Sequence, residues 1–106
     1  MLPEYRIDNM IEISKSGDRI FIEGHAEYAE PGKDIVCAAI STLSQVFVAS
    51  VEELTAAKIK TAVTSGYTDI VIEESTERAQ VLIDSFFIGC QMVADQYPEY
   101  VRVTKR

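Results

Sequence analysis

The spacing of the hydrophobic residues changes along the chain, and these changes predict the order of strands and helices. Apolar residues alternate imperfectly over residues 5–14 and more clearly over residues 19–24, which is the two-residue period of strands. Ser16-Gly17-Asp18 between the two segments is a turn signal. The pattern therefore predicts a hairpin whose second strand ends beside His25.

The next segment has the spacing of a helix. Residues 26–33 are small and polar, so we expect a loop there, and Asp34 is a suitable N-cap for a helix that follows. From this point apolar side chains recur every three or four positions, which predicts a helix of about 18 residues. The apolar positions that define it are Val36, Ile40, Leu43, Phe47 and Val51.

A second hairpin is predicted after this helix. Residues 55–65 alternate between apolar and polar side chains, and Ser65-Gly66 is a tight-turn signal. Residues 67–73 again have the composition of a strand. The second half of the chain therefore repeats the architecture of the first half without repeating its sequence.

A second helix and a short strand complete the pattern. Ser75 or Thr76 precedes the helix, which is expected to reach Asp95 or Gln96 because Pro98 stops it. Residues 100–103 can add a closing strand at a sheet edge. In a chain of 106 residues this order indicates one domain over residues 1–106. The expected fold is α+β, with two layers, a largely antiparallel sheet and two helices.

The second helix is apolar almost all round, which bears on the oligomeric state of the protein. Between residues 79 and 94, polar side chains interrupt the apolar ones at few positions. A helix of this kind must be covered on more than one side. A homodimer interface is the preferred interpretation, and a deeply buried central helix is the alternative.

Charge and composition exclude several classes of function. The formal net charge is −7, so the surface should repel nucleic acids and anionic membranes and attract a basic protein. No uninterrupted apolar run approaches the roughly 20 residues of a membrane span, and the first residues do not resemble a signal peptide. We therefore expect a cytoplasmic protein whose two cysteines are thiols. One histidine and two cysteines are too few for a zinc site without carboxylates or a second subunit, and no cofactor is expected.

The candidate chemistry lies between residues 24 and 41. His25 follows a strand, and Cys37 lies near the start of a helix, where partial positive charge favours a thiolate. A base facing such a thiol is the arrangement of a cysteine nucleophile. Cys90 is the contrast, because its place in the middle of an apolar helix is typical of a core thiol.

Four further residues are candidates for supporting roles. Gly24 allows close approach of the backbone, and Ala38 leaves room for a peptide beside the thiol. Ser41 lies one helical turn after Cys37, so it can hydrogen-bond the thiolate or substrate, or a backbone carbonyl of its own helix. Asp34 either caps the helix or orients His25. Backbone N–H groups at the helix start, with that of Cys37 as one candidate, would hold an oxyanion.

The segment GHAEYAEPGKDIVCAAIS resembles the signature of the bacterial ribosomal-processing cysteine proteases. The matching residues are Gly24, His25, Ala26, Gly32, Asp34, Val36, Cys37, Ala38 and Ser41. In length and in order of elements the resemblance extends over the whole chain.

The resemblance implies a function. Members of this family are small cytosolic homodimers with an α+β fold. They remove a short N-terminal extension from large-subunit ribosomal protein number twenty-seven, with an apolar residue before the scissile bond. The family's catalytic dyad corresponds to His25 and Cys37, its motif aspartate and serine to Asp34 and Ser41, and the loop between His25 and Asp34 is expected to be mobile. The alternatives are a non-catalytic ribosome-associated binding module and a thiol redox sensor on the same fold.

Overall fold

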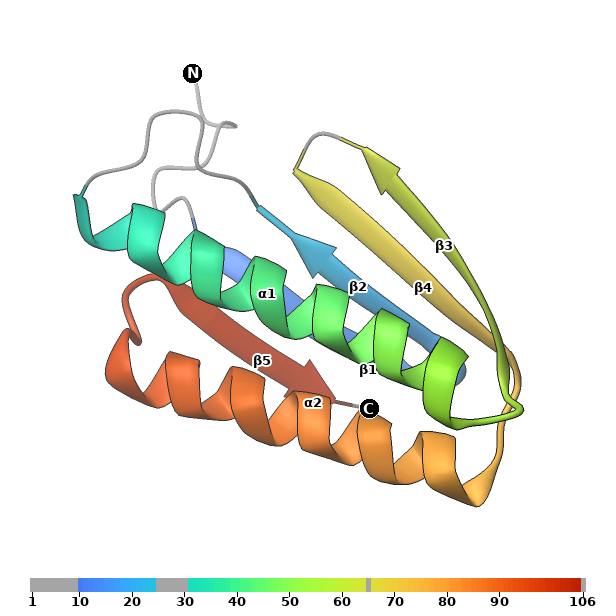
Figure 1. Cartoon of the computed structure of the whole chain (residues 1–106). Helices are drawn as coiled ribbons and strands as arrows, with labels where there is room; N and C mark the ends of the chain where they lie inside the picture. Colours follow the sequence, from blue (N-terminus) through green and yellow to red (C-terminus); the bar gives the residue numbers. More distant parts are fainter. Residues whose placement is uncertain (1–9, 25–30, 65, 106) are drawn as a thin grey trace.

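The computed structural model describes residues 10–24, 31–64 and 66–105. Within these residues the elements follow in the predicted order of hairpin, helix, hairpin, helix and closing strand (Figure 1). They are β1 (Ile11–Ser16), β2 (Arg19–Glu23), α1 (Pro31–Leu54), β3 (Lys58–Thr64), β4 (Tyr67–Glu74), α2 (Glu77–Gln96) and β5 (Val101–Lys105).

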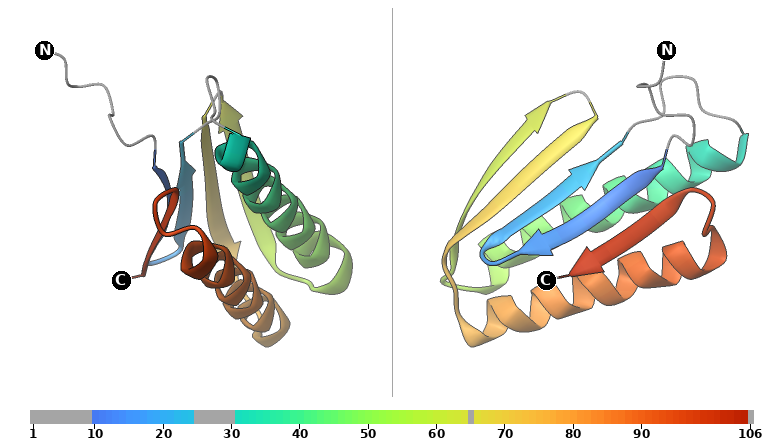
Figure 2. Two further views of the ribbon diagram at one scale, coloured as in Figure 1. Left: turned by 90° about the vertical axis from the view of Figure 1, so that its left-hand side faces the viewer. Right: turned by 180° about the vertical axis from the view of Figure 1, so that it is seen from behind.

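The strands form one mixed sheet in the order β3-β4-β2-β1-β5. Three neighbouring pairs are antiparallel, and β5 lies parallel to β1 at the sheet edge. Both helices cover the same face of this sheet (Figure 2). The predicted two-layer α+β fold with a largely antiparallel sheet is therefore confirmed, and so is the closing strand at an edge.

The hydrophobic core lies between the sheet and the two helices. Its centre is formed by β-branched side chains of the strands, among which Ile13, Ile20 and Ile70 have no exposed surface. The predicted apolar face of α1 supplies Val36, Ile40, Phe47 and Val51, all buried in this core. On α2 the buried residues are Ala79, Ile83, Phe86, Phe87, Cys90 and Ala94.

Helix α1 begins earlier than predicted. It starts at Pro31 and runs for 24 residues, so Asp34 lies inside its first turn and is not the N-cap. The prediction was wrong because Pro31 and Gly32 suggested a continuing loop. Proline is favoured at the first helical position, where its missing N–H costs no hydrogen bond and its fixed φ suits the helix.

The other boundaries differ less from the prediction. β1 extends to Ser16, because Ser16 still pairs with Arg19 across a two-residue turn. Gly17 in this turn has a φ of +59°. Residues 5–9, which were also predicted as strand, lie outside the described residues. Helix α2 begins as predicted, since the hydroxyl of Thr76 accepts a hydrogen bond of 3.1 Å from the N–H of Ala79.

Helix α1 contains an apolar segment as long as a membrane span, although polar residues interrupt it, which the expectation from continuous apolar runs did not include. The segment Ile35–Leu54 has a mean hydropathy of 1.7, so by length and composition alone it is able to cross a membrane. Core helices of soluble proteins pass the same test. One face of α1 packs against the sheet through the buried residues named above, and 22% of the apolar segment is buried in the structure.

Candidate active site

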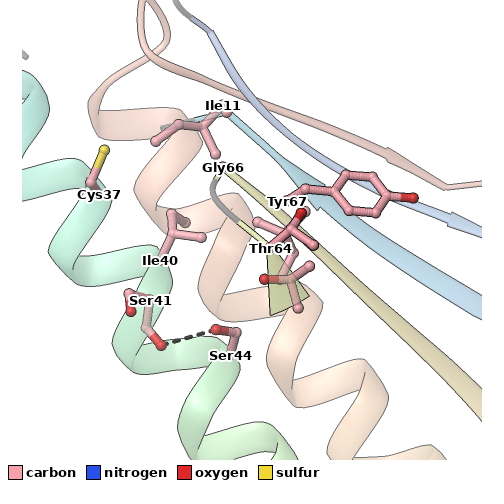
Figure 3. A pocket seen from close by; sticks show the side chains of 11 residues that line it. Ile11, Cys37, Ile40, Ser41, Ser44, Thr64, Gly66 and Tyr67 are labelled. Atoms are coloured by element: carbon pink, nitrogen blue, oxygen red, sulfur yellow. Dashed lines mark hydrogen bonds between the residues drawn. The ribbon is translucent and has the colours of Figure 1, made fainter. Parts of the chain in front are cut away.

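Cys37 lies on α1 at the rim of a cavity that opens between this helix and one end of the sheet (Figure 3). The thiol is half-buried and packs against the core. The cavity has a volume of about 250 Å³. Its lining comes from α1 and from the ends of β1, β2, β3 and β4: Ile11, Ile22, Gly24, Cys37, Ile40, Ser41, Ser44, Thr64, Gly66, Tyr67 and Thr68. This places Cys37, Gly24 and Ser41, three of the candidate residues, around one space.

Gly24 forms a wall of this cavity that only glycine can form without rearrangement. Its φ is +123°, a backbone conformation that residues with a side chain rarely adopt. A Cβ atom at this position would lie 2.9 Å from the Cα of Ile11 and 2.9 Å from the carbonyl oxygen of Met10. The N–H of Gly24 donates a 2.9 Å hydrogen bond to the carbonyl of Gly66. The chain thus leaves β2 tied to the turn between β3 and β4.

His25 follows directly after this wall but lies outside the described residues. The loop expected over residues 26–33 lies partly outside them too, and its last residues belong to α1. The structure therefore places Gly24, the residue directly before His25 in the sequence, while the pairing of His25 with Cys37 stays a prediction.

The early start of α1 changes the electrostatic argument for Cys37. Cys37 is the seventh residue of the helix, whereas the influence of the helix dipole falls off within the first turn. In a helix beginning at Pro31 the N–H of Cys37 is inside the regular hydrogen-bonding pattern, because unpaired N–H groups end before Asp34. A helix that starts at Pro31 thus disfavours this N–H as an oxyanion donor, and the source of the oxyanion hole stays a prediction. The side chain of Asp34 lies outside the described residues.

Ser41 lines the cavity one turn after Cys37. Its hydroxyl oxygen accepts a 2.9 Å hydrogen bond from Nε2 of Gln45, and its carbonyl accepts one of 2.9 Å from the hydroxyl of Ser44. A hydroxyl that accepts one hydrogen bond keeps its own proton to donate. The serine can thus donate to a thiolate or to a substrate carbonyl.

Ala38 faces a different space. It lines a groove of about 670 Å³ between α1 and α2, together with Ile35, Gly89 and Met92. Successive residues of a helix point about 100° apart, so Cys37 and Ala38 cannot both face the same cavity wall. The structure therefore separates Ala38 from the residues around Cys37.

Cys90 is a buried core thiol, as the sequence predicts. It has no exposed surface, and burial raises the pKa of its thiol from 9.0 to about 12. A buried thiol of this kind is neutral at physiological pH and is inaccessible to a peptide. Of the two cysteines, Cys37 is the one with access to solvent and to a cavity.

Several cavity residues were not found by sequence reasoning. Tyr67 lines the cavity together with Ile11 and Ile22 because β4 pairs with β2 and not only with β3. That strand order cannot be obtained from the spacing of apolar residues. Gly66 was recognisable in the sequence as a turn glycine, and its φ in the structure is +74°.

Comparison with known proteins identifies the family. Residues 9–102 match the family model for cysteine protease Prp. The ribosomal processing cysteine protease Prp of Mycoplasma genitalium is 30% identical over 100 residues, which cover 91% of this chain and 96% of that protein.

Solved structures agree with this assignment. SMU.848 from Streptococcus mutans is 30% identical, with a TM-score of 0.79 over 92% of this chain and 94% of that one. The ribosomal processing protease Prp from Staphylococcus aureus, with a covalently linked product peptide, has the same fold at 22% identity. Its TM-score is 0.77 over 92% of this chain and 98% of that chain. The chain therefore belongs to the Prp family of cysteine proteases, and is a cysteine endopeptidase of ribosomal processing.

Proposed function

We propose that this protein removes the short N-terminal extension of large-subunit ribosomal protein number twenty-seven during ribosome maturation, with His25 and Cys37 as its catalytic dyad. One observation carries the assignment of the nucleophile. Cys37 opens onto a cavity, while Cys90 is enclosed in the core. Gly24, which forms a wall of the same cavity, directly precedes His25 in the sequence.

The chemistry follows from the two side chains. His25 takes the proton of Cys37, and the sulfur attacks the carbonyl carbon of the scissile peptide bond. The resulting tetrahedral intermediate collapses to a thioester as the C–N bond breaks, and the imidazolium gives its proton to the leaving amine. A water molecule, deprotonated by His25, then hydrolyses the thioester and restores the thiol. Ser41, which lines the same cavity, would donate a hydrogen bond during these steps.

The cavity beside Cys37 suits an apolar side chain. Ile11, Ile22 and Ile40 contribute to its lining, and all three are buried core residues. An apolar residue next to the scissile bond would therefore have these apolar side chains as neighbours in the cavity. This supports an apolar residue before the cleavage site.

The charge of the protein suits the proposed substrate. The net charge is −7, and ribosomal proteins that contact RNA are basic, so the two partners attract each other. The proposal places the reaction in the cytoplasm and requires neither a cofactor nor direct contact with nucleic acid. The Staphylococcus aureus relative with its covalently linked product peptide supports a mechanism through a covalent intermediate.

The proposal is tested with a synthetic peptide that spans the junction between the extension and the mature ribosomal protein. Mass spectrometry should find two products that separate at this junction, and a peptide with a scrambled junction should stay intact. Intact junction peptide after prolonged incubation would instead support a binding module. Reversible oxidation of Cys37 without peptide turnover would support a redox sensor.

The groove between α1 and α2 supports the homodimer that completes the proposal. Large apolar side chains are exposed along it and next to it: Ile35, Ile88 and Met92 are each more than 60% exposed. Such a patch on two neighbouring helices is typical of a protein interface. Contact with a second copy through this groove would cover these side chains.

Sedimentation equilibrium is expected to give about twice the chain mass of 11.8 kDa. Met92→Asp should shift the protein toward the monomer, because an aspartate buried in an apolar interface has no partner for its charge. Val63→Asp is the matched control, since Val63 is 70% exposed on β3 and lies outside this groove. A monomeric wild-type protein, or equal effects of both variants, would contradict this interface.

A further inference from the structure

A second cavity continues the space around Cys37 along α1. It has a volume of about 330 Å³ and lies between α1 and the hairpin of β3 and β4. Ser41, Ser44 and Thr68 line both cavities, so the two adjoin and form one groove. Figure 3 shows Ser41 and Ser44 next to each other on α1. We call the second part the α1–β3 groove; its further residues are Gln45, Val48, Ala49, Glu52, Thr61 and Val63.

The length of this groove suits an extended peptide. Cys37 and Glu52 are fifteen residues apart on one helix, which corresponds to about 22 Å at a rise of 1.5 Å per residue. An extended chain advances about 3.3 Å per residue, so about six substrate residues can lie between the thiol and Glu52.

The chemical character of the lining changes in steps along the groove. Close to Cys37 it is polar, with the hydrogen-bonded pair of Ser41 and Gln45. Further along α1 it is apolar, with Val48 and Ala49 on the helix, and from β3 it includes Val63, which is 70% exposed and pairs with Thr68. At the far end Glu52 is exposed, and its carboxylate adds negative charge.

We infer that the α1–β3 groove binds the substrate residues that follow the scissile bond, and that Glu52 determines specificity by attracting a basic residue there. This inference rests on the proposed function. The direction follows from charge complementarity. Removal of an N-terminal extension leaves the basic body of the ribosomal protein on the C-terminal side of the cut, and that side matches the acidic end of the groove.

Two peptides and two variants test the inference. The peptides share the residues before the scissile bond; one ends about three residues after it and the other, with a basic residue, ends about eight residues after it. The wild-type protein should cleave the longer peptide with a kcat/KM about tenfold higher. Glu52→Lys should remove this advantage, mainly through a higher KM, because a lysine repels the basic residue.

Glu53→Lys is the matched control. It changes the net charge by the same amount, but Glu53 lines a separate cavity at the end of α1 with Glu77 and Arg78. The ratio of kcat/KM for the longer peptide to that for the shorter peptide should stay within about twofold of the wild-type ratio in Glu53→Lys. Long-range attraction changes equally in both variants, so it does not account for a difference between them.

The outcomes separate this inference from the proposed function. Failure of the wild-type protein to cleave either peptide would contradict the proposed function. Cleavage of both peptides at equal rates by the wild-type protein, or equal losses in both variants, would overturn the groove assignment alone. A change in sedimentation mass in Glu52→Lys would also overturn it, because the groove would then be a contact between two copies.

Discussion

Replacement of Cys37 by alanine is expected to lower kcat/KM for the junction peptide by at least about 10³-fold, because removal of a nucleophile eliminates the covalent pathway. The effect should not come from unfolding. Cys37 is half-buried at a cavity rim, so a smaller side chain there leaves no enclosed void. Steady-state cleavage followed by chromatography measures the loss, and circular dichroism verifies the fold.

Cys90→Ala is the matched control for this substitution. Cys90 is fully buried on α2, and the loss of its sulfur should destabilise the protein by about 1–2 kcal/mol through a small cavity. Its turnover of the peptide should nevertheless remain close to that of the wild type. Full activity of Cys37→Ala, or equal inactivation by both substitutions, would contradict the assignment of Cys37 as nucleophile.

Gly24→Ala is expected to destabilise the protein by about 2–4 kcal/mol, from backbone strain and from overlap of the new methyl group. The overlap involves backbone atoms, because the Cβ would lie 2.9 Å from both the Cα of Ile11 and the carbonyl oxygen of Met10. Backbone cannot move aside as a flexible side chain can. Since Gly24 is a wall of the Cys37 cavity, kcat/KM should fall as well. Urea denaturation gives the free energy of unfolding.

Gly17→Ala separates strain from overlap. Gly17 also has a positive φ, of +59°, but a Cβ there would meet nothing within 4 Å. Its substitution should therefore cost only about 1–2 kcal/mol for the left-handed backbone, with unchanged turnover. If Gly17→Ala and Gly24→Ala lost equal stability and kept equal activity, the close approach at Gly24 would have no functional importance.

Local patterns allowed most of the elements to be predicted. The spacing of Val36, Ile40 and Phe47 depends only on helix geometry, so the buried face of α1 could be identified without knowledge of its partners. Thr76 could be recognised as a cap because its hydrogen bond to Ala79 is local. The contrast between Cys37 and Cys90 was predicted from their positions, near the start of one helix and in the middle of the other.

Features that depend on distant contacts could not be predicted in this way. The cavity floor requires β4 to pair with β2, which joins Tyr67 to Glu23 across the sheet. Ala38 was expected beside the thiol because it is its neighbour in sequence, but helix rotation turns it into the groove with Met92. The start of α1 at Pro31 was missed because proline occurs both in loops and at the first position of helices.

The central claim is that Cys37 is a nucleophile activated by His25, and its reaction rate with iodoacetamide at pH 6.5 tests this claim most directly. An ordinary cysteine, with a pKa of about 8.5, is about 1% thiolate at this pH. Peptide mapping should show that Cys37 is alkylated at least about tenfold faster than free cysteine, and His25→Ala should remove most of this advantage. Alkylation of Cys37 at the rate of free cysteine in both proteins would contradict the account.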